Sequence, residues 1–205
     1  MSRILLIDAH PQATSLCAAL AHSYAQGASE RGGVTVRTLA LRDMQFDPIL
    51  RVGYDDRQAL EPDLQMAQAA IEAADHVVIV TPLWWGSVPA LLKGFFDRTL
   101  EKGWAYRYTE KGMPEGLLAG RSARVVMTSD SPGWYLRLFQ GNPTQNQLVR
   151  STLKFCGFKP VGFTRIGPVH SSTQEQRARW LQEVERVAEK DARQLQPTSA
   201  RTANA

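Results

Sequence analysis

The chain alternates short, almost wholly apolar runs with longer amphipathic stretches, and no segment repeats along its length. The clearest apolar run is residues 76–81, which reads His-Val-Val-Ile-Val-Thr. A strand that is covered on both faces is apolar nearly throughout, whereas a strand with one face in water alternates in polarity. Such runs, separated by stretches of helical periodicity, predict an α/β protein with a mostly parallel sheet.

Five strands and five helices are expected to alternate along the chain. The strands are predicted at residues 3–8, 34–39, 76–81, 123–128 and 161–166. The helices are predicted at residues 14–31, 63–74, 89–100, 143–155 and 173–195. Apolar residues at helical spacing give these helices a face that can pack on the sheet. The alternation predicts a three-layer, doubly wound sheet, for which two strand orders are common.

The length and composition are those of one globular domain. The chain has 205 residues, 43% of them hydrophobic and 21% charged, which is enough apolar side chain for a core. We expect a single domain over residues 1–195, with a long connection at 41–62 and an irregular loop at 129–143. Residues 196–205 are polar and are expected to form a disordered tail.

Charge and cysteine content exclude several classes of function. The chain has 24 basic and 20 acidic residues, a net charge of +4 and no run of basic residues, which disfavours nucleic-acid binding. Cys17 and Cys156 form neither a CxxC pair nor part of a metal-ligand cluster, so no metal is expected. No segment approaches the length of a membrane span, and the apolar run Arg3–Ile7 does not resemble a signal peptide. We therefore expect a cytoplasmic protein without membrane insertion.

Ligands of doubly wound sheets bind at the carboxyl ends of the strands, so the connections after the first, third and fourth strands are the candidate sites. The first connection, Asp8–Leu16, contains neither a GxGxxG nor a Walker A pattern. Thr14 and Ser15 stand where the helix begins, and hydroxyls there, with free backbone N–H groups and the helix dipole, form a phosphate site. Two alternatives are that Thr14 only caps the helix and that His10 only ends the strand.

The connection after the third strand, Thr81–Pro89, holds two adjacent tryptophans, Trp84 and Trp85. Neighbouring side chains on an extended segment point in opposite directions, so both indoles cannot enter one core face. At least one is expected to cover a planar aromatic ligand, and the alternative is an aromatic plug between helices. Residues 128–135, after the fourth strand, are polar and turn-forming, and fit a binding loop or an ordinary surface turn.

Together these segments resemble the NAD(P)H:quinone oxidoreductases of the flavodoxin-like fold. That family includes DT-diaphorase-like enzymes, the bacterial modulator-of-drug-activity type and the ancillary subunits of potassium efflux systems. The resemblance covers about residues 3–190 and is most specific at residues 82–98, which begin Pro82-Leu83-Trp84-Trp85-Gly86. Further matches are His10-Pro11 with Thr14-Ser15-Leu16, residues 43–48, residues 103–108 and Phe155-Cys156-Gly157-Phe158. The resemblance implies a flavodoxin-like sheet of five parallel strands in the order 2-1-3-4-5.

The resemblance also implies a flavin site. The residues around the flavin phosphate would be His10, Thr14, Ser15, Leu16 and Cys17. Those holding the isoalloxazine ring would be Pro82, Leu83, Trp84, Trp85 and Gly86, with Thr128, Ser129 and Asp130 at its other edge. Relatives that bind FAD often have asparagine in place of Cys17, so FMN is favoured and FAD is the alternative. The chain also departs from the family at Asp130-Ser131-Pro132, which replaces a pair of glycines, and at Gly86, where some relatives carry an aromatic residue.

The activity implied by the resemblance is hydride transfer from NAD(P)H to a quinone-type acceptor by a ping-pong mechanism. Tyr106 and Tyr108 resemble tyrosines that reach across a homodimer to line the acceptor pocket, and Trp134 is a further candidate for that pocket. No general acid or base is assigned. The alternatives are a flavin-binding regulatory subunit of a membrane transporter, a flavodoxin-like electron carrier and a flavin-free binding domain. Electron carriers usually have a threonine-rich phosphate loop and an acidic surface, and this chain has neither.

Overall fold

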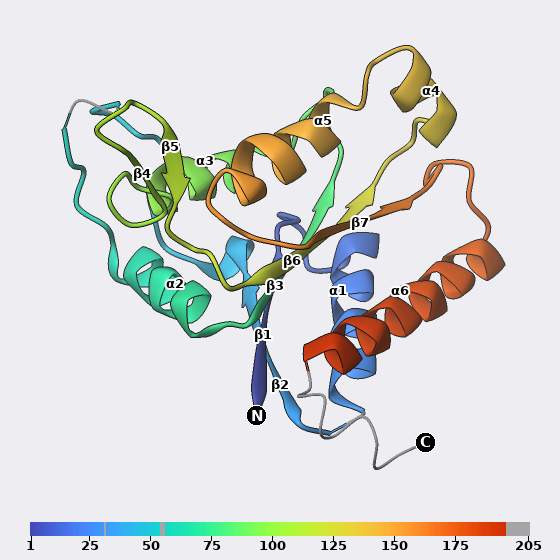
Figure 1. Ribbon diagram of the computed structural model, residues 1–205. Helices are drawn as coiled ribbons and strands as arrows, with labels where there is room; N and C mark the ends of the chain where they lie inside the picture. Colours follow the sequence, from blue (N-terminus) through green and yellow to red (C-terminus); the bar gives the residue numbers. More distant parts are fainter. Residues whose placement is uncertain (31, 54–55, 196–205) are drawn as a thin grey trace.

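The computed structural model describes residues 1–30, 32–53 and 56–195, so the tail expected at 196–205 lies outside the described residues. Its main sheet consists of the parallel strands β1 (Ser2–Asp8), β2 (Val34–Ala40), β3 (His76–Pro82), β6 (Ser122–Thr128) and β7 (Val161–Ile166). They lie side by side in the order β2-β1-β3-β6-β7 (Figure 1). Counted along the chain, this is the order 2-1-3-4-5, so the predicted fold class and strand order are confirmed.

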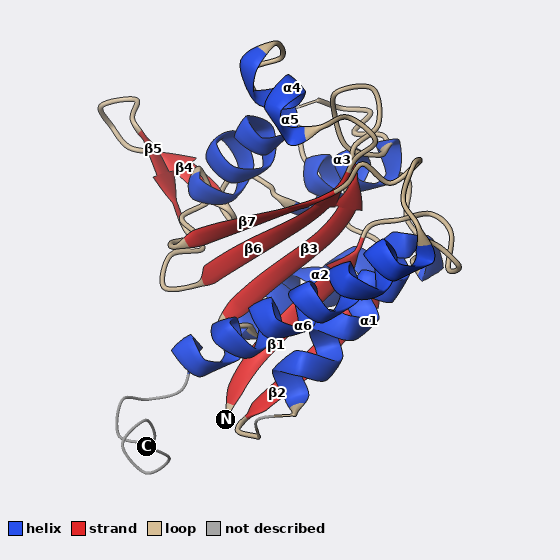
Figure 2. Ribbon diagram, turned by 90° about the vertical axis from the view of Figure 1, so that its right-hand side faces the viewer, coloured by secondary structure: helices blue, strands red, loops and turns tan. Residues whose placement is uncertain are grey.

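Helices cover both faces of this sheet. On one face lie α1 (Leu16–Ser29) and α6 (Gln174–Leu195), which run side by side in Figure 2. On the other lie α2 (Pro62–Ala73), α3 (Ala90–Thr99) and α5 (Pro143–Asn146), which continues as the π-helical segment η2 (Gln147–Lys154). The crossover that leaves β1 and the crossover that leaves β2 therefore lie on opposite faces. This places the topological switch point between β1 and β3.

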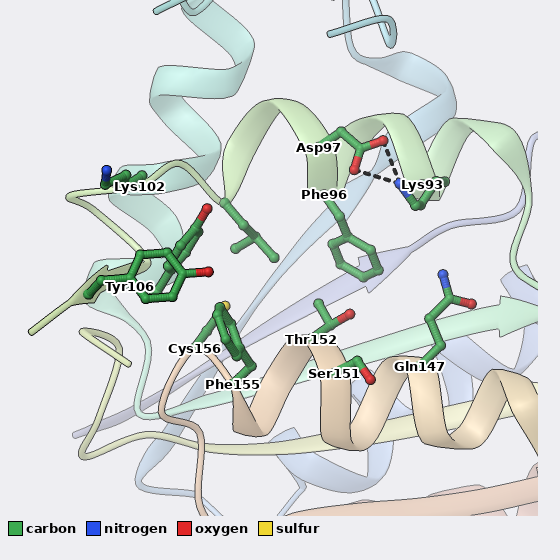
Figure 3. Close-up of a pocket in the computed structure, with 12 residues that line it drawn as sticks. Lys93, Phe96, Asp97, Lys102, Tyr106, Gln147, Ser151, Thr152, Phe155 and Cys156 are labelled. Atoms are coloured by element: carbon green, nitrogen blue, oxygen red, sulfur yellow. Dashed lines mark hydrogen bonds and ion pairs between the residues drawn. The ribbon is translucent and has the colours of Figure 1, made fainter. Parts of the chain in front are cut away.

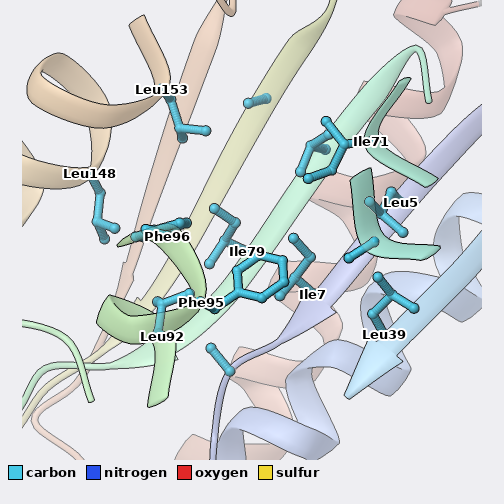
Figure 4. Close-up of a cluster of buried hydrophobic side chains, with 14 of the residues drawn as sticks. Leu5, Ile7, Leu39, Ile71, Ile79, Leu92, Phe95, Phe96, Leu148 and Leu153 are labelled. Atoms are coloured by element: carbon cyan, nitrogen blue, oxygen red, sulfur yellow. The ribbon is translucent and has the colours of Figure 1, made fainter. Parts of the chain in front are cut away.

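Each face of the sheet has its own apolar core. Leu5 and Ile7 of β1 belong to the core under α2 and α3, where Phe95 packs against the sheet (Figure 4). Ile4 and Leu6 of the same strand belong to the core under α1 and α6. Successive side chains of a strand point to opposite faces, so an unbroken apolar run fills both cores. Each such side chain stabilises the fold by about 1.5–3 kcal/mol when it is fully buried.

Local capping explains where α1 begins and ends. Ser15 is the N-cap, and its hydroxyl accepts a hydrogen bond from the backbone N–H of Ala18 at 3.1 Å. The helix therefore begins at Leu16, two residues later than predicted. After the helix, Gly32 and Gly33 have φ of +67° and +74°, which glycine adopts without the strain of a Cβ atom.

Four short elements were not predicted. They are the 3₁₀ turn η1 (Leu41–Asp43), the hairpin strands β4 (Tyr106–Tyr108) and β5 (Pro114–Gly116), and α4 (Gly133–Leu138). The expectation of an irregular loop over 129–143 is therefore wrong for residues 133–138. A helix of six residues contains less than two turns, which is too short to show the periodicity that identifies helices in a sequence.

A buried polar cluster joins α1, α6 and the sheet. The carboxylate of Asp191 on α6 accepts a hydrogen bond from the hydroxyl of Tyr24 at 2.7 Å and forms an ion pair with Arg124 of β6. The Nδ1 atom of His76 on β3 lies 2.7 Å from the hydroxyl of Ser122. Burial alone raises the pKa of Asp191, but hydrogen bonds from Arg124, His76 and Tyr24 outweigh it and hold the pKa well below its usual range.

Within the part of the chain that the structure describes, no helix combines the length and the apolar character needed to cross a bilayer.

Candidate functional site

A cleft of about 300 Å³ opens where β1, β3 and β6 end, beside the switch point. Its lining consists of His10, Gln12, Ser15, Leu16, Cys17, Pro82, Leu83, Trp84, Thr128, Ser129, Asp130, Val169 and Arg177. The structure thus brings together three connections that lie far apart in the sequence. Among the residues predicted to bind the cofactor, Thr14, Trp85 and Gly86 are not part of this lining.

A buried carboxylate directs the chain as it leaves β1. The carboxylate of Asp8 accepts a hydrogen bond from the backbone N–H of His10 at 3.2 Å. It also forms an ion pair with the Nη1 atom of Arg42 at 2.5 Å. The same guanidinium atom lies 3.4 Å from the carbonyl oxygen of His10. Because Asp8 is 2% exposed, these contacts are shielded from water and fix the backbone at His10 firmly.

The position of its protons makes His10 a hydrogen-bond donor in the cleft. Its Nδ1 atom accepts the backbone N–H of Gln12 at 3.0 Å, which assigns the proton of the neutral ring to Nε2. The imidazole packs edge-on against the indole of Trp84, with ring centroids 5.6 Å apart and an angle of 76° between the planes. The ring orientation is therefore set by a hydrogen bond on one side and an aromatic contact on the other.

The amino end of α1 supplies the groups that bind anions. Ser15 occupies the N-cap, and the first turn contains no acidic residue. Free N–H groups and the helix dipole at such an end favour negative charge. Arg177, near the start of α6, lines the same cleft, and its Nε atom donates to the hydroxyl of Ser172 at 2.9 Å. Thr14 is exposed and is not the cap, so the alternative that Thr14 caps the helix is wrong.

Cys17 and Thr128 meet at the base of the cleft. Their Sγ and Oγ1 atoms lie 3.3 Å apart, which links α1 to the end of β6. Burial raises the pKa of the Cys17 thiol to about 12, and the nearby Asp8 carboxylate acts in the same direction, although the Thr128 contact opposes them. Cys17 therefore remains a neutral thiol at physiological pH and offers no nucleophile.

A tight turn of unusual backbone geometry follows β3. The backbone N–H of Trp84 bonds to the carbonyl of Ser87, and the N–H of Ser87 bonds to the carbonyl of Trp84, both at 2.9 Å. Between them Trp85 and Gly86 have φ of +52° and +71°, the left-handed pair that a two-residue hairpin turn requires. The N–H groups of these two residues make no hydrogen bond within the described part of the chain. They are therefore free to bind a ligand.

The tryptophans of this turn do not form a plug between helices. The side chain of Trp85 is fully exposed, and that of Trp84 is 43% exposed at the edge of the cleft. Neither indole enters a core face, as expected, but the predicted reason is wrong, because Trp85 lies in a tight turn and not in an extended segment. Exposed tryptophans at a pocket rim are unusual unless they contact a ligand or another chain.

The loops after β6 and β7 close the remaining side. The backbone N–H of Val169 donates to the carbonyl of Ser129 at 3.1 Å, and that of His170 to the carboxylate of Asp130 at 2.7 Å. These contacts bring Val169 into the cleft. Val169 carries no signal in the sequence. Arg177 could have been found, since it lies in the first turn of the helix that follows the last strand.

The predicted acceptor residues lie outside this cleft. Tyr106 and Tyr108 line a second groove of about 480 Å³ between α3, β4 and η2, shown in Figure 3, with their ring centroids 5.9 Å apart. Trp134 lies on α4, where it contacts Tyr135 and Phe139. A single chain thus brings the two tyrosines together but does not join them to Trp134 or to the cleft.

Across residues 1–30, 32–53 and 56–195 there is no group of three or more His, Cys, Asp or Glu side chains arranged to hold a metal ion.

Comparison with known proteins agrees with the fold. Residues 2–190 match the model of a family described by the flavodoxin-like fold. An uncharacterized NAD(P)H oxidoreductase of Haemophilus influenzae is 34% identical over 173 residues, which cover 81% of this chain and 84% of that protein. The FMN-dependent NADH:quinone oxidoreductase 1 of Idiomarina loihiensis is 32% identical over 131 residues, or 62% of this chain and 68% of that protein. The crystal structure of Smu.1420 from Streptococcus mutans superposes with a TM-score of 0.79 at 28% identity, covering 92% of this chain and 99% of that one.

Proposed function

The chain belongs to the family with the flavodoxin-like fold, and from this premise we propose that it is an FMN-dependent oxidoreductase that transfers hydride from NAD(P)H to a quinone-type acceptor. One observation carries the proposal. The cleft at the anion-binding end of α1 is bordered at Trp84 by an aromatic turn, whose next two residues, Trp85 and Gly86, lie outside the lining and have amide groups that bond to nothing in the described part of the chain.

The donor groups of the cleft fit both ends of FMN. The phosphate would be held by the first-turn amides after Ser15, the Nε2–H group of His10 and the charge of Arg177. The isoalloxazine ring would be held by Trp84 and the free N–H groups of Trp85 and Gly86. Thr128, Ser129 and Asp130 would line its other edge, beside Pro82 and Leu83.

When bound, FMN supplies the two-electron chemistry that links nicotinamide oxidation to quinone reduction. The chain's own contribution is orientation and electrostatics. The amides of Trp85 and Gly86 are fixed dipoles that would favour negative charge on a ring held against them. The edge-on contact between His10 and Trp84 would hold both rings in place at one edge of the cleft. In a ping-pong mechanism the nicotinamide leaves before the quinone enters, so both would use the open side of the cleft in turn.

The acceptor pocket is proposed to be completed by a second copy of the chain. Three aromatic side chains are exposed in the single chain: Trp85 (103%), Trp134 (61%) and Tyr108 (53%). Aromatic residues are enriched in protein interfaces, so these three are candidates for contact with a second chain. Tyr106 and Tyr108 are too well separated from the cleft of their own chain to share its lining. A homodimer would let them cover the ring site of the partner, with Trp134 at the same pocket.

The test is to purify the protein, record its visible spectrum, identify released flavin by chromatography and follow its reduction and reoxidation. We expect a yellow protein that releases FMN, is reduced by NADH or NADPH and is reoxidised by a quinone. Parallel lines in double-reciprocal rate plots would indicate the ping-pong mechanism. A flavoprotein that does not oxidise NAD(P)H would point to an electron carrier. A colourless protein that takes up neither FMN nor FAD would overturn the proposal.

A further inference from the structure

The turn at Trp84–Ser87 is held from outside by the α5–η2 segment. The hydroxyl of Thr144 on α5 donates a hydrogen bond to the carbonyl of Gly86 at 2.6 Å. The hydroxyl of Ser87 donates to the side-chain carbonyl of Gln147, the first residue of η2, at 3.1 Å. Thr144 is 1% exposed, so its contact with the turn is shielded from water.

This turn needs an external support. Trp85 has a bulky side chain and a φ of +52°, a conformation that such residues rarely adopt. Strained backbone of this kind persists where the surroundings determine it. The indole of Trp85 is fully exposed, so no side chain in the described part of the molecule covers it and could do so. The support must therefore act on the neighbouring residues, Gly86 and Ser87, where the two hydrogen bonds lie.

The support is itself anchored to the sheet. Arg165 of β7 donates through Nη2 to the side-chain oxygens of Asn142 at 2.8 Å and Gln145 at 3.2 Å. Asn142 also has a positive φ, +52°, at the start of α5. Asn142 and Gln145 thus tie α5 to the end of β7, and Thr144 of α5 holds the turn that follows β3. The turn is therefore connected to β7 through α5.

We propose that Thr144 is a positioning residue for the flavin site. Its hydrogen bond to Gly86, together with the contact between Gln147 and Ser87, keeps the free amides of Trp85 and Gly86 aligned with the ring. The inference rests on the proposed function, since it assumes that flavin is the ligand of this turn. Donors aimed at charge that develops on reduction stabilise the reduced form more than the oxidised form. A turn that loses its alignment should therefore hold reduced FMN less tightly and oxidised FMN almost as before.

The matched variants are Thr144→Val, which keeps the shape but removes the hydroxyl, and Thr144→Ser, which keeps the hydroxyl. In the flavin-free protein, we expect the Ser87 amide to exchange its hydrogen several-fold faster in Thr144→Val and at the wild-type rate in Thr144→Ser. In the FMN-loaded protein, we expect Thr144→Val to weaken reduced FMN by about tenfold relative to oxidised FMN. That ratio corresponds to a midpoint potential about 30 mV more negative for a two-electron couple. Thr144→Ser should restore the wild-type potential.

Ser87→Ala provides an independent variant, because it removes the contact with Gln147 without changing a fully buried residue. The same direction of change is expected, and it carries the test if Thr144→Val does not fold. Wild-type exchange and wild-type potential in a folded Thr144→Val protein that oxidises NAD(P)H would overturn the positioning role and leave the function intact. A wild-type protein that binds no flavin would overturn the function, and the positioning role with it.

Discussion

At the residue scale, a position in the lining of the cleft does not by itself make a residue reactive. Cys17 lies in the lining, yet its sulfur is in hydrogen-bond contact with the hydroxyl of Thr128, and burial raises the pKa of its thiol. Trp85 is outside the lining, yet it lies next to the cleft with a positive φ of +52° and a fully exposed side chain. The backbone of the turn and the indole of Trp85 can therefore be tested separately.

Trp85→Ala should lower both flavin content and turnover, because the exposed indole is available to cover the ring while the turn amides remain. The measurement is the ratio of flavin to protein absorbance, followed by the steady-state rate. Ile49→Ala, which changes an exposed apolar residue that lines neither the cleft nor the groove, is the control and should keep its flavin. Unchanged flavin content and turnover in Trp85→Ala would show that the proposed ring site is wrong.

Cys17 should resist alkylation in the native protein. Burial raises its pKa to about 12, so near pH 8 its thiolate fraction is far lower than that of an ordinary cysteine. Iodoacetamide labelling followed by mass spectrometry should show slow modification in buffer and fast modification in urea. Rapid native labelling would contradict the buried contact with Thr128.

At the scale of elements, the fold is governed by where helices begin and by what ties them to the sheet. Ser15 both caps α1 and lines the cleft, whereas its neighbour Thr14 does neither. Asp191 ties α6 to α1 and to β6 through Tyr24 and Arg124. We therefore expect a change at Ser15 to affect both ligand binding and stability, and a change at Asp191 to affect stability alone.

Ser15→Ala should destabilise the protein by about 1 kcal/mol through loss of the cap, and should also weaken FMN binding. Thr14→Ala is the matched control and should change both quantities less, because Thr14 is exposed and outside the cleft. Urea unfolding of the flavin-free proteins and fluorescence titration with FMN measure the two effects. A larger effect of Thr14→Ala on FMN binding would favour Thr14 as a phosphate ligand, as the sequence predicted.

Asp191→Asn should destabilise the protein by about 3 kcal/mol at pH 7, because it leaves the half-buried guanidinium of Arg124 without its counter-charge. The folded-state pKa of Asp191 is lowered, so its stabilisation is present above the unfolded-state pKa near 3.8 and is lost as the pH falls below that value. The difference between wild type and variant in urea unfolding should therefore shrink below pH 4. Glu183→Gln, an exposed change on the same helix, should have little effect at either pH.

At the scale of the whole molecule, one chain holds the proposed flavin cleft and a pair of tyrosines in separate places. The proposed homodimer joins them, and a two-fold arrangement would do so twice. Sedimentation should therefore give about twice the mass of one chain. A purely monomeric, fully active protein would contradict the shared acceptor pocket.

Mixing two impaired variants tests the shared pocket directly. Trp85→Ala impairs the ring site of its own chain, and Tyr108→Ala removes the side chain that reaches into the partner's pocket. A dimer of either variant alone should therefore turn over slowly. After unfolding and refolding together, about half the dimers are mixed, and each mixed dimer has one intact site, which should restore roughly a quarter of the wild-type rate. Absence of any recovery would place both residues in the site of the same chain.

The amino-acid sequence was enough to predict the sheet strands to within one residue at each end, the doubly wound architecture and the three connections that form the cleft. These follow from hydrophobic periodicity, which is a local property of the chain. The hairpin β4–β5 and α4 were missed because each element is too short to establish a period.

Which side chains meet could be seen only in the folded molecule. The pairing of Cys17 with Thr128, the arrival of Arg177 beside α1 and the support of Gly86 by Thr144 join residues between 58 and more than 100 positions apart. Such contacts depend on strand order, on the face to which each crossover turns and on the rotation of each helix about its axis. None of these quantities is encoded in the composition of a local segment, because they are set by how the two cores pack against the sheet.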